Sequence, residues 1–148
     1  MSYEGLQAGT VKFQGHNGDP SEGYLARPLR AGKRPGVVVI HHMPGWDEWI
    51  TEVVRKFAHH GYTAIAPNLF VRFGPGSPDD VTARSRPAGG ASDAEVMGDV
   101  AASIELLRAE PLTHAPMVRQ GAAARLAERA LDGWLRARIA QDHPNFLR

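Results

Sequence analysis

Two adjacent histidines and the lack of any cysteine define the chemistry that this chain can offer. Imidazole is a common general acid or base near neutral pH and a common metal ligand. His41 and His42 follow an aliphatic run at residues 37–40, and consecutive side chains of a strand point to opposite faces. The pair is therefore poorly placed to bind one ion. We predict a structural or loop role for both residues and no metal site.

Ser92 is the serine whose surroundings come nearest to those of a nucleophile, within Gly-Ala-Ser-Asp-Ala at residues 90–94. A nucleophilic serine of this kind sits on a sharp turn between a strand and a helix, but residues 82–89 are a poor strand. Ser92 and Glu95 instead have the spacing of a capping box. We interpret Ser92 as the N-cap of a helix.

Other side chains suited to substrate contacts are arginine and tryptophan. Arg72, Arg84 and Arg86 lie in a long loop-like segment, and a guanidinium group can hold a substrate carboxylate with two hydrogen bonds. The alternative for each is a solvated loop charge; we select Arg72 as the substrate-binding candidate. Trp46 can line the mouth of a pocket or pack in the core, and we name it as a second substrate-binding candidate. Trp49 fits the buried stripe of a helix.

Composition excludes several classes of function. The 148 residues carry 17 basic and 16 acidic side chains, so no strong field attracts nucleic acid or anionic lipid. No segment is long and apolar enough to span a bilayer, and nothing at the first residues suggests export. We therefore expect a cytoplasmic protein with no cofactor, no nucleic-acid partner and no membrane partner.

The strands and helices that must position these residues predict an α/β fold. Two strands with a turn at residues 15–20 predict an antiparallel hairpin. A strand at 36–41, a helix that Asp47 caps and a strand at 62–67 predict a right-handed βαβ unit with parallel strands. Residues 68–91 are loop-like, and Ser92 begins a second helix.

A compositional break near Pro111 divides the chain. Residues 112–148 contain six Arg, eight Ala and no Lys, and they predict a helix from about Met117 to Ala140 with no strand. We expect an N-terminal portion at 1–111 and an Ala/Arg-rich helical tail at 112–148. A sheet that ended after Ala66 would have an open edge, which predicts a homo-oligomer.

The segment at residues 37–70, VVVIHHMPGWDEWITEVVRKFAHHGYTAIAPNLF, resembles the dienelactone hydrolase family. These proteins are α/β hydrolases that act on lactones and related esters. The likeness runs from about Val11 to Pro111. It includes Ala-Pro-Asn-Leu-Phe at residues 66–70, similar to the family's A-P-D-L-Y pattern, and the helix that contains Asp99. It covers the first half of a typical member.

The resemblance implies a partial α/β-hydrolase sheet, made of the hairpin and the parallel βαβ unit, with two further helices. It implies that the backbone N–H of Met43 donates to a developing oxyanion. Many members have His-Glu at this strand end, where the Glu lies beside the catalytic thiol; here His42 stands in its place and is the catalytic side-chain candidate. The ligand implied is a small-molecule ester or lactone.

The family nucleophile lies in a G-x-C-x-G elbow on the strand after the Asp99 helix, and this sequence has no such elbow. We therefore expect a hydrolase-like chain that is inactive alone. One alternative is a non-catalytic small-molecule-binding or scaffold domain that oligomerises. The others are a subunit that a partner completes, and an altered reading frame after Pro111.

Overall fold

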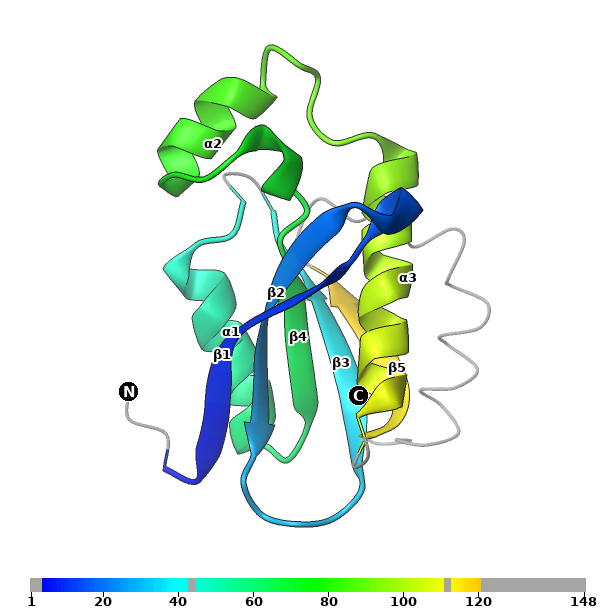
Figure 1. Cartoon of the computed structure of the whole chain (residues 1–148). Helices are drawn as coiled ribbons and strands as arrows, with labels where there is room; N and C mark the ends of the chain where they lie inside the picture. Colours follow the sequence, from blue (N-terminus) through cyan, green and yellow to red (C-terminus); the bar gives the residue numbers. More distant parts are fainter. Residues whose placement is uncertain (1–3, 43–44, 111–112, 121–148) are drawn as a thin grey trace.

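A mixed β-sheet forms the centre of the fold (Figure 1). The computed structural model describes residues 4–42, 45–110 and 113–120. Within these residues the sheet has five strands in the order β1-β2-β4-β3-β5. The strands are β1 (Leu6–Gln14), β2 (Pro20–Pro28), β3 (Arg34–Ile40), β4 (Thr63–Pro67) and β5 (Thr113–Gln120). The helices are η1 (His16–Gly18), α1 (Glu48–His59), η2 (Val71–Phe73), α2 (Pro78–Ser85) and α3 (Asp93–Ala109).

The predicted hairpin and βαβ unit are both confirmed. β1 pairs antiparallel with β2 along its whole length, and β3 pairs parallel with β4. The hairpin turn contains Asn17 at φ 53° and Gly18 at φ 79°, a backbone conformation that these two residue types tolerate best. β2 also pairs antiparallel with β4, which joins the hairpin to the parallel strands in one sheet.

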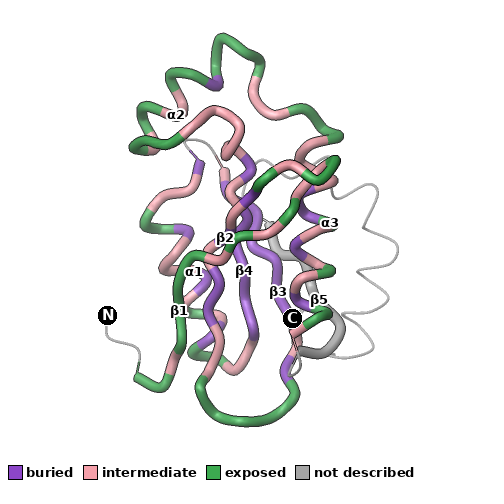
Figure 2. Tube along the Cα trace, in the orientation of Figure 1, coloured by how far each residue is buried: buried purple, intermediate pink, exposed green. Residues whose placement is uncertain are grey.

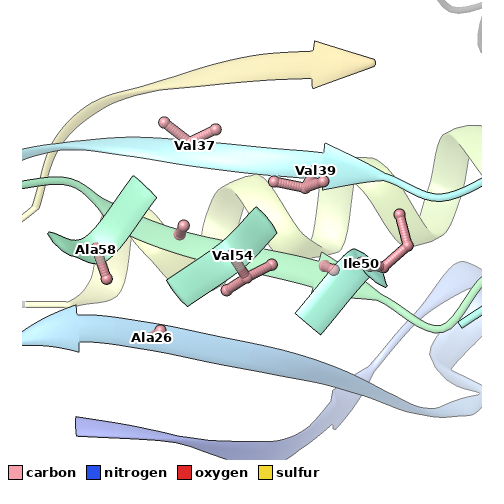
Figure 3. Packing of buried hydrophobic residues seen from close by; sticks show 8 residues of the cluster. Ala26, Val37, Val39, Ile50, Val54 and Ala58 are labelled. Atoms are coloured by element: carbon pink, nitrogen blue, oxygen red, sulfur yellow. The ribbon is translucent and has the colours of Figure 1, made fainter. Parts of the chain in front are cut away.

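Each face of the sheet has its own core, because strand side chains alternate between faces. On one face Val37, Val39 and Ala64 pack against Ile50, Val54 and Ala58 of α1 (Figure 3). On the other face, Val38, Ile40 and Ile65 pack against α3. The central strands are the most deeply buried part of the chain, while the segment around α2 is largely exposed (Figure 2). None of the described helices has the length and hydropathy needed to cross a bilayer.

Helix α1 begins as predicted, but one of its aromatic residues is placed differently. The Asp47 side chain accepts a hydrogen bond from the Ile50 N–H at 2.9 Å, which confirms Asp47 as the N-cap. The prediction that Trp49 lies on the buried stripe is wrong, since 57% of its surface is exposed. The stripe runs through Ile50, Val54 and Ala58 at intervals of four, and Trp49 lies about 100° away from Ile50 around the helix.

The segment at residues 68–91 is more regular than the loop that we predicted. It contains η2 and the eight-residue α2. The missed signal is Ser77-Pro78-Asp79-Asp80: Ser77 and Asp80 form a capping box, with proline in the first helical turn. Arg84 donates to the carbonyl oxygens of Phe73 and Pro75, both at 2.6 Å, which folds the segment back on itself.

The sheet continues beyond Pro111, where we expected a helical tail without a strand. Residues Thr113–Gln120 form β5, which pairs parallel with β3. The predicted helix start at Met117 is therefore wrong for residues 117–120, and the remainder of that helix lies outside the described residues. Pairing with the edge of β3 outweighs a weak local strand signal. It also moves the edge of the described sheet from β3 to β5, and the homo-oligomer stays a prediction.

The two capping boxes give a first test of which parts of the fold unfold together. Ser92→Ala removes a cap from α3, which packs on the core, and should lower the free energy of unfolding by about 1 kcal/mol. Ser77→Ala is the matched variant in α2, which packs mainly on η2. It should lower the global value by less than about 0.5 kcal/mol, because α2 opens locally.

Urea denaturation measures the global effect of both variants, and amide hydrogen exchange measures local opening of α2. Equal losses in the two variants would mean that α2 belongs to the same cooperative unit as α3.

Candidate functional site

The carboxyl ends of β3 and β4 lie at the same end of the sheet because the two strands are parallel. We call this end of the sheet the carboxyl edge. In open α/β sheets, ligands bind at this edge, in the loops that follow the strands. Here the β3–α1 loop and the segment after β4 meet, and α2 lies beyond them (Figure 1). This edge is therefore the candidate site.

His41 holds the two loops together. It follows the end of β3, is 1% exposed, and its Nε2 accepts the Leu69 N–H at 3.0 Å. Nε2 must then be unprotonated, so Nδ1 carries the proton and donates it to the His42 carbonyl oxygen at 3.2 Å. Burial lowers the pKa of His41 to about 4, so the ring is neutral at pH 7. His41 has the structural role that was one of our two expectations.

The carbonyl oxygen of His42 is held twice. It accepts from His41 Nδ1 and, at 2.7 Å, from the N–H of Gly45. The His42 ring packs edge-on against Trp49, with centroids 5.6 Å apart. Its Nδ1 is buried and has no hydrogen-bond partner within the described part of the chain. Met43, the predicted oxyanion donor, lies outside the described residues.

Trp46 is half-buried and packs against the core on the α1 face. Its ring packs with the cluster around Val39 and Ile50 and meets Tyr24 edge-on, with centroids 6.5 Å apart. Its Nε1 is buried without a partner among the residues that the structure describes. The ring contacts fit the core alternative of the sequence analysis, and the substrate-binding role of Trp46 stays a prediction.

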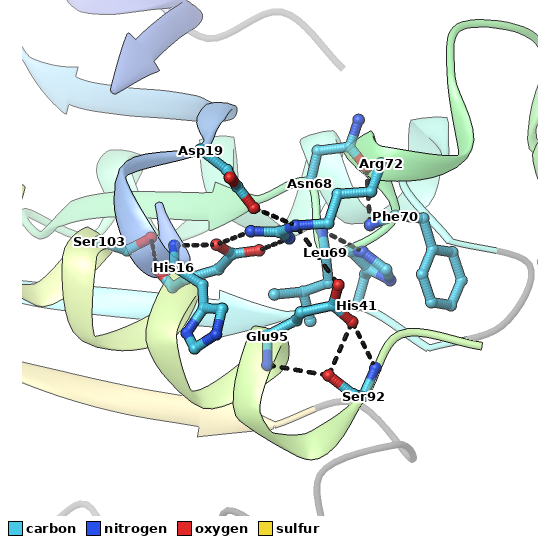
Figure 4. Close-up of polar contacts among 11 residues, drawn as sticks. His16, Asp19, His41, Asn68, Leu69, Phe70, Arg72, Ser92, Glu95 and Ser103 are labelled. Carbon is cyan, nitrogen blue, oxygen red and sulfur yellow. Dashed lines mark hydrogen bonds and ion pairs between the residues drawn. The ribbon is translucent and has the colours of Figure 1, made fainter. Parts of the chain in front are cut away.

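A buried ion pair lies beside the same edge, and the sequence analysis missed half of it (Figure 4). The Asp99 side chain on α3 is fully buried and accepts two hydrogen bonds from Arg72, at 2.7 Å from Nη1 and 3.1 Å from Nη2. The backbone N–H of His16 donates to the same carboxylate at 2.8 Å. Arg72 Nε donates to Asp19 at 2.9 Å. The hydrogen bonds to Asp99 raise the pKa of Arg72.

The predicted chemistry of Arg72 is present, but its partner belongs to the protein. The guanidinium binds a carboxylate with two hydrogen bonds, as we expected for a substrate, yet that carboxylate is Asp99. Its remaining donor, Nε, is taken by Asp19. The described contacts therefore give Arg72 a structural role and do not support its assignment to substrate.

Two glycines let η1 approach α3 closely enough to complete this network. A Cβ on Gly15 would overlap Oδ1 of Asp99, and a Cβ on Gly98 would lie 2.7 Å from the Cβ of His16. One available sequence signal was Asp99 itself, a charged residue beside Val96 and Val100 on the apolar stripe of its helix. A buried carboxylate needs a cationic or hydrogen-bonding partner, but sequence does not say which arginine supplies it.

Ser92 is an N-cap, as predicted. Its Oγ accepts the Glu95 N–H at 3.3 Å, and its hydroxyl and N–H both donate to the Glu95 carboxylate. In these contacts the hydroxyl group is used to cap the helix. In the described ranges, no group of three or more His, Asp or Glu residues lies together in a way that could hold a metal ion.

The ion pair makes a prediction about stability. Arg72→Met leaves the Asp99 carboxylate buried and unpaired, and should lower the free energy of unfolding by about 3–5 kcal/mol. Arg86→Met removes an exposed arginine of the same segment and should cost less than about 0.5 kcal/mol. Urea denaturation of both variants checks this. Equal effects would show that the pair contributes little to stability.

His41 makes a prediction about pH. The unfolded chain binds a proton at His41 near pH 6.5, whereas the folded chain does so near pH 4. Above pH 6.5, His41 therefore does not change the free energy of unfolding. As the pH falls from 6.5 to 4, protonation of His41 lowers the free energy of unfolding by up to about 3 kcal/mol. Unfolding free energies of wild type and His41→Asn across this range should converge at low pH, whereas the exposed His60→Asn should follow wild type. An NMR titration of His41 with a midpoint near 6.5 would contradict this.

Comparisons with known proteins agree with this geometry. The model of the dienelactone hydrolase family matches residues 21–118. A candidate carboxymethylenebutenolidase of Synechocystis is 34% identical over 94 residues, which cover 60% of this chain and 38% of that protein. The crystal structure of a candidate dienelactone hydrolase from Klebsiella pneumoniae superposes with a TM-score of 0.67 at 27% identity. That match covers 78% of this chain and 49% of the Klebsiella chain.

A cold-adapted esterase from an Arctic intertidal metagenomic library shares the fold, with a TM-score of 0.58 at 19% identity. The match covers 81% of this chain and 52% of the esterase. The chain thus spans about half or less of the length of these proteins. Its sheet is the amino-terminal part of the α/β-hydrolase fold, and the chain belongs to the dienelactone hydrolase family.

Proposed function

We propose that the described residues form the amino-terminal half of an ester or lactone hydrolase site. We further propose that the 148-residue chain by itself does not perform the family's thiol-dependent hydrolysis. The observation that carries both parts is the arrangement of loops around the carboxyl edge. Hydrogen bonds fix the β3–α1 loop in place, which an oxyanion loop requires. β5 is followed by a sequence with no nucleophile.

The first part rests on the His42 carbonyl. Hydrolases of this fold take one oxyanion-hole amide from the β3–α1 loop. Such an amide stabilises a transition state only if it is held in place beforehand. A peptide group is planar, so the direction of a carbonyl sets that of the next amide. The bonds from His41 Nδ1 and Gly45 N–H to the His42 carbonyl are therefore the means of holding this loop ready.

The second part rests on β5. This strand follows α3 directly and pairs with β3, the order in which the family places the strand of its nucleophile. After Gln120, however, the sequence continues Gly-Ala-Ala-Ala-Arg at 121–125, and the chain contains no cysteine. Ser92, the one serine that we weighed as a substitute, is occupied as an N-cap.

The chemistry that remains is electrostatic. In the family reaction a thiolate attacks the carbonyl carbon, the carbonyl oxygen gains the charge, and a histidine moves the proton to the leaving group. This chain supplies the group that stabilises the oxygen, and water must be the nucleophile. Oxyanion stabilisation and binding without a nucleophile leave at most about 10³-fold acceleration over water.

The test is hydrolysis of p-nitrophenyl acetate and of dihydrocoumarin by the purified chain. We expect turnover well below about 1 s⁻¹, the low end for ordinary enzymes. Iodoacetamide should have no effect, because the chain has no thiol, and inhibition by it would reveal a contaminating hydrolase.

Three variants separate the sources of any residual rate. Ser92→Ala should leave the rate unchanged, whereas a complete loss with the fold intact would restore a serine mechanism. A loss in His42→Ala, but not in the matched His60→Ala, would indicate a histidine-assisted water. Saturable turnover above about 1 s⁻¹ by the wild type would overturn the proposal of inactivity.

The second candidate is a non-catalytic domain that binds a small ester or lactone at this edge. The buried Nε1 of Trp46, which has no partner within the described ranges, favours it because an incoming carbonyl group is a suitable acceptor. Tryptophan fluorescence during titration with a non-hydrolysed lactam analogue distinguishes the two. A saturable change that Trp46→Phe removes and Trp49→Phe keeps supports binding without catalysis.

A further inference from the structure

A cavity lies at the opposite end of the sheet, away from the candidate site. It is formed where β2 ends, β3 and β4 begin and α3 ends, at the lower end of the sheet in Figure 1. Its volume is about 170 Å³. The charged side chains that line it are Arg27, Arg34 and Glu110. Gln7 and Thr63 add polar groups to the wall.

Arg27 is paired with other residues of this wall. Its Nη1 lies 2.6 Å from the Glu110 carboxylate, and its Nε and Nη2 donate to the Gln7 side-chain oxygen at 3.0 and 2.9 Å. Arg27 and Glu110 therefore balance one another in charge. The remaining charge on the cavity wall is that of Arg34.

Among the residues that the structure describes, Arg34 is a buried cation without a matching anion. Only 7% of its surface is exposed, and its Nη2 is shielded from solvent and has no hydrogen-bond partner in the described part of the chain. Within the described ranges, no carboxylate forms an ion pair with it. Burying an unpaired ion is costly, and the usual compensation is an anion of matching geometry. The excess positive charge thus lies on the wall of a cavity with room for such an anion.

We propose that this cavity binds a small oxyanion on Arg34. A planar guanidinium can bind two oxygens of a carboxylate or a phosphate, and Arg34 carries the unbalanced charge among the described residues of this wall. Thr63, which is 2% exposed, lines the same cavity. The proposal is independent of the hydrolase site, because it rests on the amino ends of β3 and β4 rather than on the loops at their carboxyl ends.

The experiment uses the full chain and two probes, inorganic phosphate and acetate. Each is titrated at constant ionic strength against chloride while the melting temperature and the ¹⁵N–¹H NMR shifts of the amides of Lys33, Arg34, Gly36 and Thr63 are followed. A ligand that binds only the folded state raises the melting temperature, and the amide shifts must saturate at the same concentration. Saturation by phosphate alone identifies a phosphate site, and saturation by acetate identifies a carboxylate site. No saturable change with either anion overturns the proposal.

Two variants and a matched control test whether Arg34 is the group responsible. Arg34→Gln should weaken the affinity at least tenfold, whereas Lys33→Gln, which removes the same charge from the exposed neighbouring position, should retain it. Glu110→Gln removes the negative charge from the wall and should strengthen binding. Equal weakening by Arg34→Gln and Lys33→Gln would overturn the proposal. Weaker binding in Glu110→Gln would overturn it too, and this result stands even if Arg34→Gln fails to fold.

Discussion

The buried carboxylate of Asp99 is the constraint on which the carboxyl edge of this fold depends. A carboxylate without water must be paired, and Asp99 obtains its partners from segments far apart in sequence: Arg72 after β4 and the N–H of His16 after β1. Meeting this requirement brings η1, η2 and α3 together. The hairpin, the βαβ unit and the core on the α3 face of the sheet are thereby joined at one point (Figure 4).

His41 solves a related problem with a neutral group. Its ring replaces water for the Leu69 N–H, which lies just after β4, and for the His42 carbonyl, which lies just after β3. A neutral imidazole has one donor and one acceptor, which is what these two groups need. The price is sensitivity to acid, because burial disfavours the charged ring. The hydrogen bonds that hold this loop thus come from a neutral, buried side chain.

Local signals in the sequence were sufficient for much of this fold. Alternating residues and turn chemistry predicted the hairpin, and a β-branched run before a capped amphipathic segment predicted the βαβ unit. Asp47 and Ser92 were recognisable as caps because a cap involves residues only three apart. β5 was missed because its partner, β3, lies more than 70 residues earlier, and α2 was missed because glycine and proline dominate its flanks. For Arg72 the sequence indicated the bonding mode, whereas only the folded chain brings Asp99 to it.

The close approach of η1 to α3 has a consequence for comparing this chain with its relatives. Gly15 and Gly98 have no room for a side chain, because a Cβ there would meet Asp99 or His16. Gly15 leaves room for the carboxylate of Asp99, and Gly98 leaves room for the side chain of His16. A substitution at position 15 should therefore be accepted only where residue 99 also changes, and one at position 98 only where residue 16 also changes. Coupled change within these two pairs across the family would then trace the history of a packing requirement, and not the history of an activity.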